Sequence, residues 1–139
     1  SSNGVKTIPV TVLPKYTLYE DLTPYIGASV STITNKFGSG YTTSQNTDGS
    51  TTYTYKNYNM YTAGLGFKIT NGKCDSAIVA ASTTYTSMLS DYLIERYYVV
   101  GMQNDIFFFL DHDKKVAIAF TVYSYSTLSV MYYPYNSSD

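Results

Sequence analysis

The stretch PYIGASVSTITNKFG, residues 24–38, encodes a short helix together with both of its ends. Ser29 is a favourable N-cap residue, and Gly38 suits the left-handed position that commonly follows a helix. The apolar residues that share one helical face, at spacings of three and four, are Val30, Ile33 and Phe37. A helix of about nine residues is not stable alone. We therefore expect this face to pack against an apolar surface formed by another part of the chain.

Two turn signals follow the helix, and both dipeptides are typical of tight β-hairpins. With their flanking segments, they are Asp48-Gly49 between residues 41–43 and 51–55, and Asn71-Gly72 between residues 65–69 and 73–81. In the second hairpin, Leu65, Phe67 and Ile69 alternate with small or polar residues, a period of two that gives the strand one buried face. We expect this face to receive the helix.

The second half of the chain returns to the same alternation of helix and strands. Residues 86–97 carry apolar side chains at helical spacing and predict a second helix. The apolar run Ile106–Leu110 has the length and aromatic content of a buried central strand. After a polar turn at residues 111–115, two more strands are expected at residues 116–123 and 127–133.

The N-terminal part of the chain is expected to be extended. Residues 5–13 predict a strand or arm, which Pro9 and Pro14 confine to a sheet edge or to an approach segment. Residues 17–22 predict a brief helical turn that ends before Pro24, because the residue preceding a proline disfavours the helical region.

These elements predict one α+β domain, an antiparallel sheet packed by one or two short helices. A chain of 139 residues has the size of a single domain. We divide it into an extended arm or linker at residues 1–14, the domain at 15–135 and a polar tail at 136–139. The order of helix, strands and hairpin occurs over residues 17–82 and again over 83–135, which suggests a structural duplication.

The composition excludes some partners. Nine Lys and Arg against ten Asp and Glu leave a formal charge of -1, whereas a nucleic-acid surface needs a concentrated basic face. Nucleic acid is therefore not expected as a partner. No apolar run reaches the roughly 18 residues of a membrane-spanning helix, and the single cysteine excludes an internal disulfide.

Tyrosine is unusually frequent, with 17 Tyr and no Trp. The interpretation that we favour is structural, because tyrosine serves half-buried strands by packing its ring while its hydroxyl stays wet. The alternative is a tyrosine-lined surface that binds protein, peptide or glycan. Residues two positions apart on an expected strand share a face, as Tyr53 does with Tyr55 and Tyr123 with Tyr125. The binding candidates are Tyr53, Tyr55, Tyr58, Tyr61, Tyr123 and Tyr125.

Two stretches resemble a known family. The first is Ile26-Gly27-Ala28-Ser29 with Ile33 and Phe37-Gly38, and the second is Ile106–Leu110 with Asp111-His112-Asp113 and Val116–Ala119. This pattern resembles the CAP-associated N-terminal domain of Firmicutes secreted proteins, and is also similar to small envelope modules of the beta-lactamase-inhibitor and outer-membrane-assembly-lipoprotein type. The resemblance implies an accessory domain of an extracellular or cell-surface protein of a Gram-positive bacterium, with no catalytic residues to carry over.

Few residues of this sequence are candidates for catalysis or metal binding. Cys74 and His112 are the only residues of their types, and a nucleophilic pair oriented by Asp111 or Asp113 would make a small hydrolase. The triplet at residues 111–113 lacks the second cluster that a zinc set needs, so we expect no metal and no cofactor. The other acids are scattered over expected helices and turns, where nothing in the sequence pairs them: Glu20, Asp21, Asp91, Glu95 and Asp105.

The sequence thus favours a non-catalytic extracellular accessory or interaction domain that binds a protein or cell-wall partner through its tyrosines. The alternatives are the Cys74–His112 hydrolase and a purely structural spacer. A spacer would expose no contiguous apolar surface beyond a few hundred Å².

Overall fold

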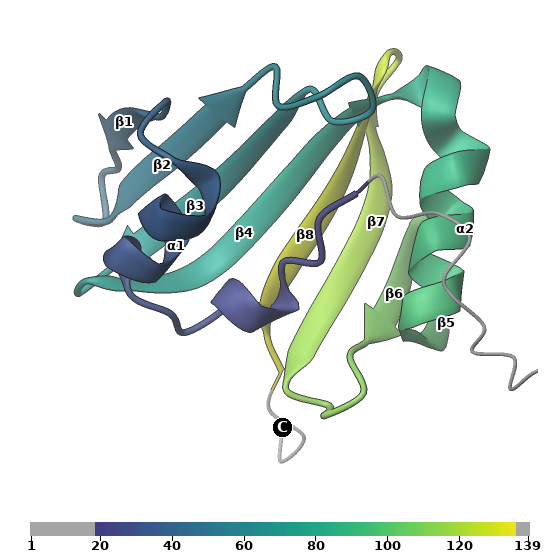
Figure 1. Cartoon of the computed structure of the whole chain (residues 1–139). Coiled ribbons are helices and arrows are strands. Elements are labelled where there is room, and N and C mark those ends of the chain that lie inside the picture. The colour runs from purple at the N-terminus through teal and green to yellow at the C-terminus, as the bar shows by residue number, and fades with distance from the viewer. Residues whose placement is uncertain (1–18, 136–139) are drawn as a thin grey trace, which may run out of the picture.

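The structure is a computed structural model that describes residues 19–135 (Figure 1). The strand expected at residues 5–13 and the tail at 136–139 lie outside these residues. One eight-stranded antiparallel sheet carries two α-helices and two short 3-10 helices, which confirms the α+β class. In chain order the elements are η1 Thr23–Tyr25, α1 Val30–Phe37, β1 Thr42–Gln45, β2 Thr51–Lys56, β3 Gly64–Thr70, β4 Lys73–Ser82, η2 Thr83–Tyr85, α2 Thr86–Arg96, β5 Tyr98–Gln103, β6 Ile106–Leu110, β7 Val116–Ser124 and β8 Thr127–Pro134.

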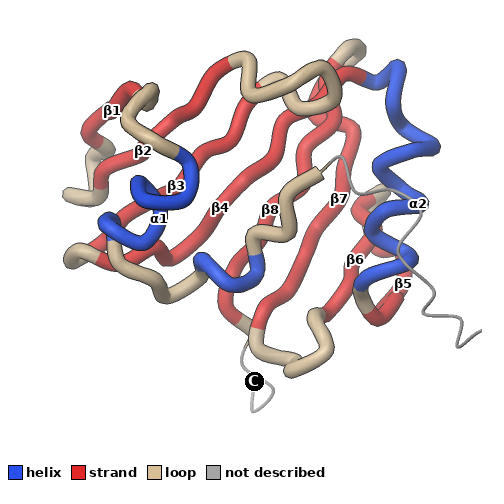
Figure 2. The backbone as a smooth tube through the Cα atoms, in the orientation of Figure 1, coloured by secondary structure: helices blue, strands red, loops and turns tan. Residues whose placement is uncertain are grey.

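The strand order is β1-β2-β3-β4-β8-β7-β6-β5. Each half of the chain contributes one α-helix followed by four consecutive strands, and the halves meet where β4 pairs with β8 in the middle of the sheet (Figure 2). The first strand of each half, β1 or β5, therefore lies at an edge of the sheet.

The first helix forms as the sequence predicts. The Ser29 side chain accepts a hydrogen bond from the Thr32 amide at 3.3 Å, and Gly38 caps the other end with φ at +96°. Ile33 is buried, and the Phe37 ring lies 5.2 Å from the ring of Phe67 on β3. The helix is thus held by the apolar face of the second hairpin.

Both predicted hairpins are present, β1 with β2 and β3 with β4. Asn71 and Gly72 have φ angles of 52° and 79°, the left-handed values that a type I′ turn requires. Leu65, Phe67 and Ile69 of β3 are buried, so the predicted period of two is confirmed.

The two α-helices and the segment before α1 lie on one face of the sheet (Figure 1). We call this the helix face and the opposite one the open face. The helix face holds the core, in which Tyr92 of α2 and Tyr132 of β8 are among the largest fully buried side chains.

Two local predictions are wrong, and a third, the second helix, is confirmed with its end one residue from the expected position. The described residues 20–22 are not helical, and the turn of helix is instead η1, which contains Pro24 in its first turn because the fixed proline φ suits that position. Helix α2 ends at Arg96, one residue earlier than expected. The run Ile106–Leu110 is not central: β6 lies next to the edge strand β5, and of its side chains only Phe109 is fully buried.

Candidate functional site

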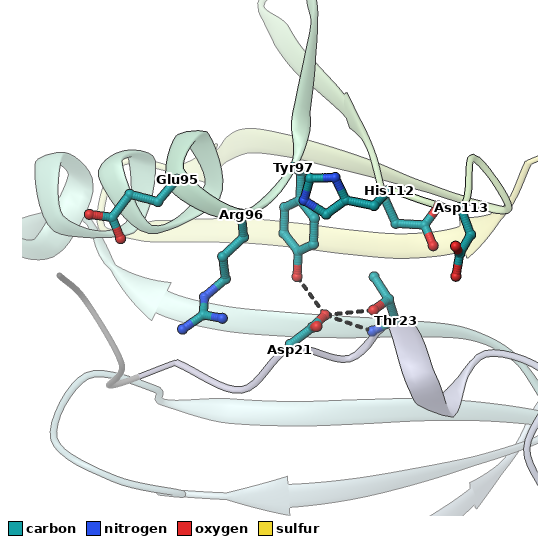
Figure 3. Close-up of a pocket in the computed structure, with 8 residues that line it drawn as sticks. Asp21, Thr23, Glu95, Arg96, Tyr97, His112 and Asp113 are labelled. Carbon is teal, nitrogen blue, oxygen red and sulfur yellow. Dashed lines mark hydrogen bonds between the residues drawn. The ribbon is translucent and has the colours of Figure 1, made fainter. Parts of the chain in front are cut away.

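A polar hollow of about 370 Å³ opens at the C-terminal end of α2 (Figure 3). Three segments that are distant in the chain form it: residues 21–23 at the start of η1, the end of α2 with the residue after it, and the loop between β6 and β7. Its lining residues are Asp21, Thr23, Glu95, Arg96, Tyr97, Asp111, His112 and Asp113. The acids Asp21 and Glu95, which the sequence does not pair, thus reach the same hollow as the triplet at residues 111–113.

Asp21 is the centre of the hydrogen bonds in this hollow. The Tyr97 hydroxyl donates to its Oδ1 at 2.6 Å, and the amide and hydroxyl of Thr23 donate to the same oxygen at 3.1 and 2.8 Å (Figure 3). Burial raises the pKa of Tyr97 far above its ordinary value, so the phenol stays protonated as a donor. The network fastens the segment before η1 to the end of α2.

Two further groups of the hollow are engaged in packing or in a turn. The Arg96 guanidinium lies over the Tyr92 ring, 4.5 Å from its centroid. Asp111 accepts hydrogen bonds from the amides of Lys115 and Val116 through Oδ1, which shapes the β6–β7 loop. Within residues 19–135 no group of three or more His, Cys, Asp or Glu is arranged to hold a metal ion. We read this hollow as a structural junction.

The structure does not bring Cys74 and His112 together. Cys74 is the second residue of β4, whereas His112 follows β6, and the two intervening strands β8 and β7 separate β4 from β6 by about 14 Å at the usual strand spacing. Cys74 is 1% exposed, and burial raises the pKa of its thiol to about 11. The His112 ring instead packs edge-on against Tyr98 at 4.8 Å.

Four of the six candidate tyrosines pack into the structure. Tyr55 is 4% exposed and donates its hydroxyl to the Gly38 carbonyl at 2.9 Å, and the Tyr58 hydroxyl donates to Glu20 at 2.8 Å. The rings of Tyr53 and Tyr61 lie against other tyrosine rings, at 4.8 and 5.1 Å. These positions form aromatic packing between the segment 19–41 and the sheet.

The other two candidates, Tyr123 and Tyr125, are 77% and 99% exposed. They do not share a strand face, because the pairing of β7 with β8 shifts between Val122 and Ser124, and Tyr125 lies in the turn after β7. They give two separate rings at the tip of a hairpin.

A different surface, the β5 edge, groups four of the eleven large apolar side chains that are exposed among residues 19–135. Tyr98, Val99, Val100 and Met102 are 49%, 51%, 61% and 64% exposed. The strand contains no charged residue and no proline, and within residues 19–135 it pairs with β6 alone. The opposite edge, β1, is wholly exposed but consists of Thr, Thr, Ser and Gln. Among residues 19–135 neither edge of the sheet has a partner strand on its outer side, and the β5 edge is apolar whereas the β1 edge is polar.

Hollows adjoin β5 on both faces of the sheet. On the open face a hollow of about 200 Å³ is lined by Val100, Gln103, Phe108, Phe109, Leu110, Ala117, Tyr133 and Tyr135. On the helix face a hollow of about 150 Å³ is lined by Thr86, Met102, Asp105, Phe107, Phe120, Thr121 and Val122. The side chains that line both hollows are mainly apolar, and we take the β5 edge with these two hollows as the candidate functional site.

Sequence reasoning left residues 98–105 without an element. Two signals mark the hairpin of β5 and β6. They are the β-branched pair Val99-Val100 and the turn pair Asn104-Asp105, whose two residues have positive φ angles in the structure. Comparisons with protein-family models, with curated proteins and with solved structures find no match to the chain. Among the described residues no helix is long and apolar enough to cross a membrane.

Proposed function

We propose that the chain is a non-catalytic protein-interaction domain that takes up an extended strand of its partner along the β5 edge. The observation that carries this proposal is the row of exposed apolar side chains on an unpaired, uncharged edge strand. Natural sheets usually protect such edges with charges, proline or a covering element, because the free backbone groups can pair with another chain.

The β5 edge has one protective device, a bulge at Val100. Within the described part of the chain it lacks the others: no lysine or proline stands in the strand, and four of its six residues are apolar and exposed. Leaving these side chains in water forgoes the roughly 25 cal/mol per Å² that burying apolar surface contributes. A bound strand would bury part of this area and satisfy the free backbone groups.

The two hollows beside β5 suit the side chains of an added strand. Successive residues of a strand point to opposite faces, so alternate partner residues would reach the open-face and helix-face hollows. In strand addition the backbone bonds supply affinity and such hollows supply selectivity. We expect the partner strand to carry uncharged side chains. Tyr98, Tyr133 and Tyr135 supply the tyrosine contacts.

The resemblance of residues 26–38 and 106–119 supports an extracellular or cell-surface place for this domain in a Gram-positive bacterium. Its partner would then be a secreted or cell-wall protein. The proposed strand addition at β5 does not depend on this location.

A displayed library of random octapeptides tests strand addition. Wild type is expected to enrich peptides with alternating apolar residues, and Val100→Lys, which places a charge in the edge, is expected to weaken their binding about tenfold or more. Thr43→Lys, on the polar edge β1, is the matched control and should bind as wild type does. Equal binding by wild type and Val100→Lys would show that β5 is not the site.

A further inference from the structure

We infer that the strand that β5 takes up is β5 of a second copy of this chain, in an antiparallel two-fold pair. This inference names the partner and so rests on the proposed strand addition. It follows from the order of Val99, Val100, Gly101 and Met102 along β5, which is complementary to the same four residues in reverse order.

The pairing of β5 with β6 assigns each side chain to a face. Val99 pairs with Phe109 and Met102 pairs with Phe107, two residues whose rings lie 4.5 Å apart at the core. Val99 and Met102 therefore share the helix face. Tyr98, Gly101 and Gln103 pair with the alternate residues of β6 and share the open face, while Val100 is the bulged residue.

One antiparallel register matches these faces. If Val99 lies opposite Met102 of the second copy, two apolar pairs form on the helix face, one for each copy. Tyr98 then lies opposite Gln103 of the second copy on the open face. Val100 lies opposite Gly101 of the second copy, so Val99, Val100 and Met102 each meet an apolar side chain or open space.

Gly101 provides the room that this register needs. Its φ is +143°, a conformation that favours glycine, and a Cβ there would meet nothing within 4 Å. The space beside it is bounded by Phe108, its partner on β6. Val100 of the second copy would occupy that space, so the strand carries both the protruding side chain and the gap that receives it.

The charges near the two ends of β5 are complementary. The Lys114 ammonium lies 5.9 Å from the centre of the Tyr98 ring, at the beginning of the strand. Asp105 stands two residues after Gln103, at its end. Antiparallel pairing brings each Lys114 toward Asp105 of the second copy. The same loop also carries Asp111, Asp113 and Lys115, so its formal charge is zero and the attraction is local to Lys114.

The other edge of the sheet favours a closed pair over a filament. A pair formed by the same strand of both copies uses up both β5 edges and is closed by its two-fold axis. Further growth would need β1, whose side chains are polar and exposed. We therefore expect two copies and no larger assembly.

Sedimentation equilibrium tests the assembly. Wild type and Thr43→Lys should approach the mass of two chains as concentration rises to about 0.5 mM, and Val100→Lys and Met102→Lys should dimerise at least about tenfold more weakly. Both lysines replace side chains that are more than half exposed, and circular dichroism verifies that each variant folds. Wild type that stays monomeric, or dimers that persist in both lysine variants, would overturn the inference.

Disulfide trapping tests the register. In the proposed pair, Val99→Cys with Met102→Cys in one chain places two thiols opposite each other across the axis, and mild oxidation should give a covalent dimer. In either single variant the two thiols are about 10 Å apart along the strand, too far for a disulfide. A dimer trapped equally well by a single variant would contradict the register.

The outcomes separate the partner from the mode of binding. If the chain is monomeric while alternating apolar peptides still bind in a way that Val100→Lys weakens, the second-copy inference fails and strand addition stands. If neither dimer nor peptide uses β5, both fail.

Discussion

At the scale of single residues, the buried tyrosines contribute more to the packing of the fold than to a binding surface. Tyr97 is 6% exposed and links α2 to the segment before η1 through Asp21, and its hydroxyl lies 3.5 Å from that of Tyr132. Several phenols are held protonated by burial, with the pKa of Tyr19 and of Tyr58 raised to about 12. The frequent tyrosines thus serve mainly as apolar rings with one hydrogen-bonding group.

Tyr97→Phe is expected to lower the free energy of unfolding by about 1–3 kcal/mol, because the Asp21 carboxylate loses its shortest donor. Urea denaturation measures the change. Tyr125→Phe is the matched control: its side chain is 99% exposed, and the change should stay within about 0.5 kcal/mol. Equal effects of the two substitutions would contradict the role given to Tyr97.

Cys74 is expected to react slowly with thiol reagents in the folded chain. Its side chain is 1% exposed, and burial raises the pKa of the thiol from 9.0 to about 11, while the thiolate is the reactive species. At neutral pH, labelling should be at least about 100-fold slower than in denaturant. Fast labelling of the folded chain would show that the cysteine is accessible.

The same shift predicts a loss of stability in alkali. A pKa that folding raises contributes stability that is fully present below the ordinary value of 9.0 and is lost as pH rises through about 11. Between these pH values wild type should lose more unfolding free energy than Cys74→Ala, as measured by urea denaturation. A parallel decline in both chains would contradict this prediction. The comparison isolates the thiol from the tyrosines, which titrate in both.

At the scale of elements, short sequence motifs correctly predicted the helix ends and the tight turns. Ser29 and Gly38 mark the ends of α1, and Asn71-Gly72 marks the turn between β3 and β4. Both were predictable because caps and tight turns depend on a few adjacent residues. The position of Ile106–Leu110 in the sheet could not be predicted in the same way. An apolar run indicates burial, but the strands beside it decide whether it is central.

Ser29→Ala is expected to cost about 1 kcal/mol of unfolding free energy, because the Thr32 amide loses its side-chain acceptor. Exposed Ser39, in the loop after α1, gives the control variant Ser39→Ala, which should change little. Thermal denaturation of both variants measures the difference. If the two variants melt alike, the cap does not stabilise α1.

Gly66→Ala is expected to cost about 1–3 kcal/mol of unfolding free energy, because an added Cβ would lie 2.9 Å from Cγ2 of Ile78 on β4. That methyl group belongs to a β-branched side chain and cannot turn away freely. Gly40→Ala is the control, since a Cβ there would meet nothing within 4 Å. Urea denaturation should separate the two, and equal stabilities would contradict the close contact.

At the scale of the whole molecule, the mirrored strand order explains where the candidate site lies. The strands that begin the two halves become the two edges, and only the second half begins with an apolar strand. The sequence did not reveal this edge because exposure of β5 depends on pairings between strands distant in the chain. The polar hollow could not be predicted from the sequence for the same reason, because Asp21 and Tyr97, which meet in it, are 76 residues apart in the chain.

Amide hydrogen exchange of β5, measured at low and high chain concentration, tests most directly whether this edge takes up a partner strand. The backbone amides of Tyr98–Gln103 that β6 does not pair should exchange quickly in dilute wild type and more slowly at high concentration. They should stay fast in Val100→Lys, and the amides of β1 should not respond to concentration. Exchange at β5 that is the same at every concentration, or protection that appears at β1 instead, would contradict the assignment of β5 as the docking strand for a second copy.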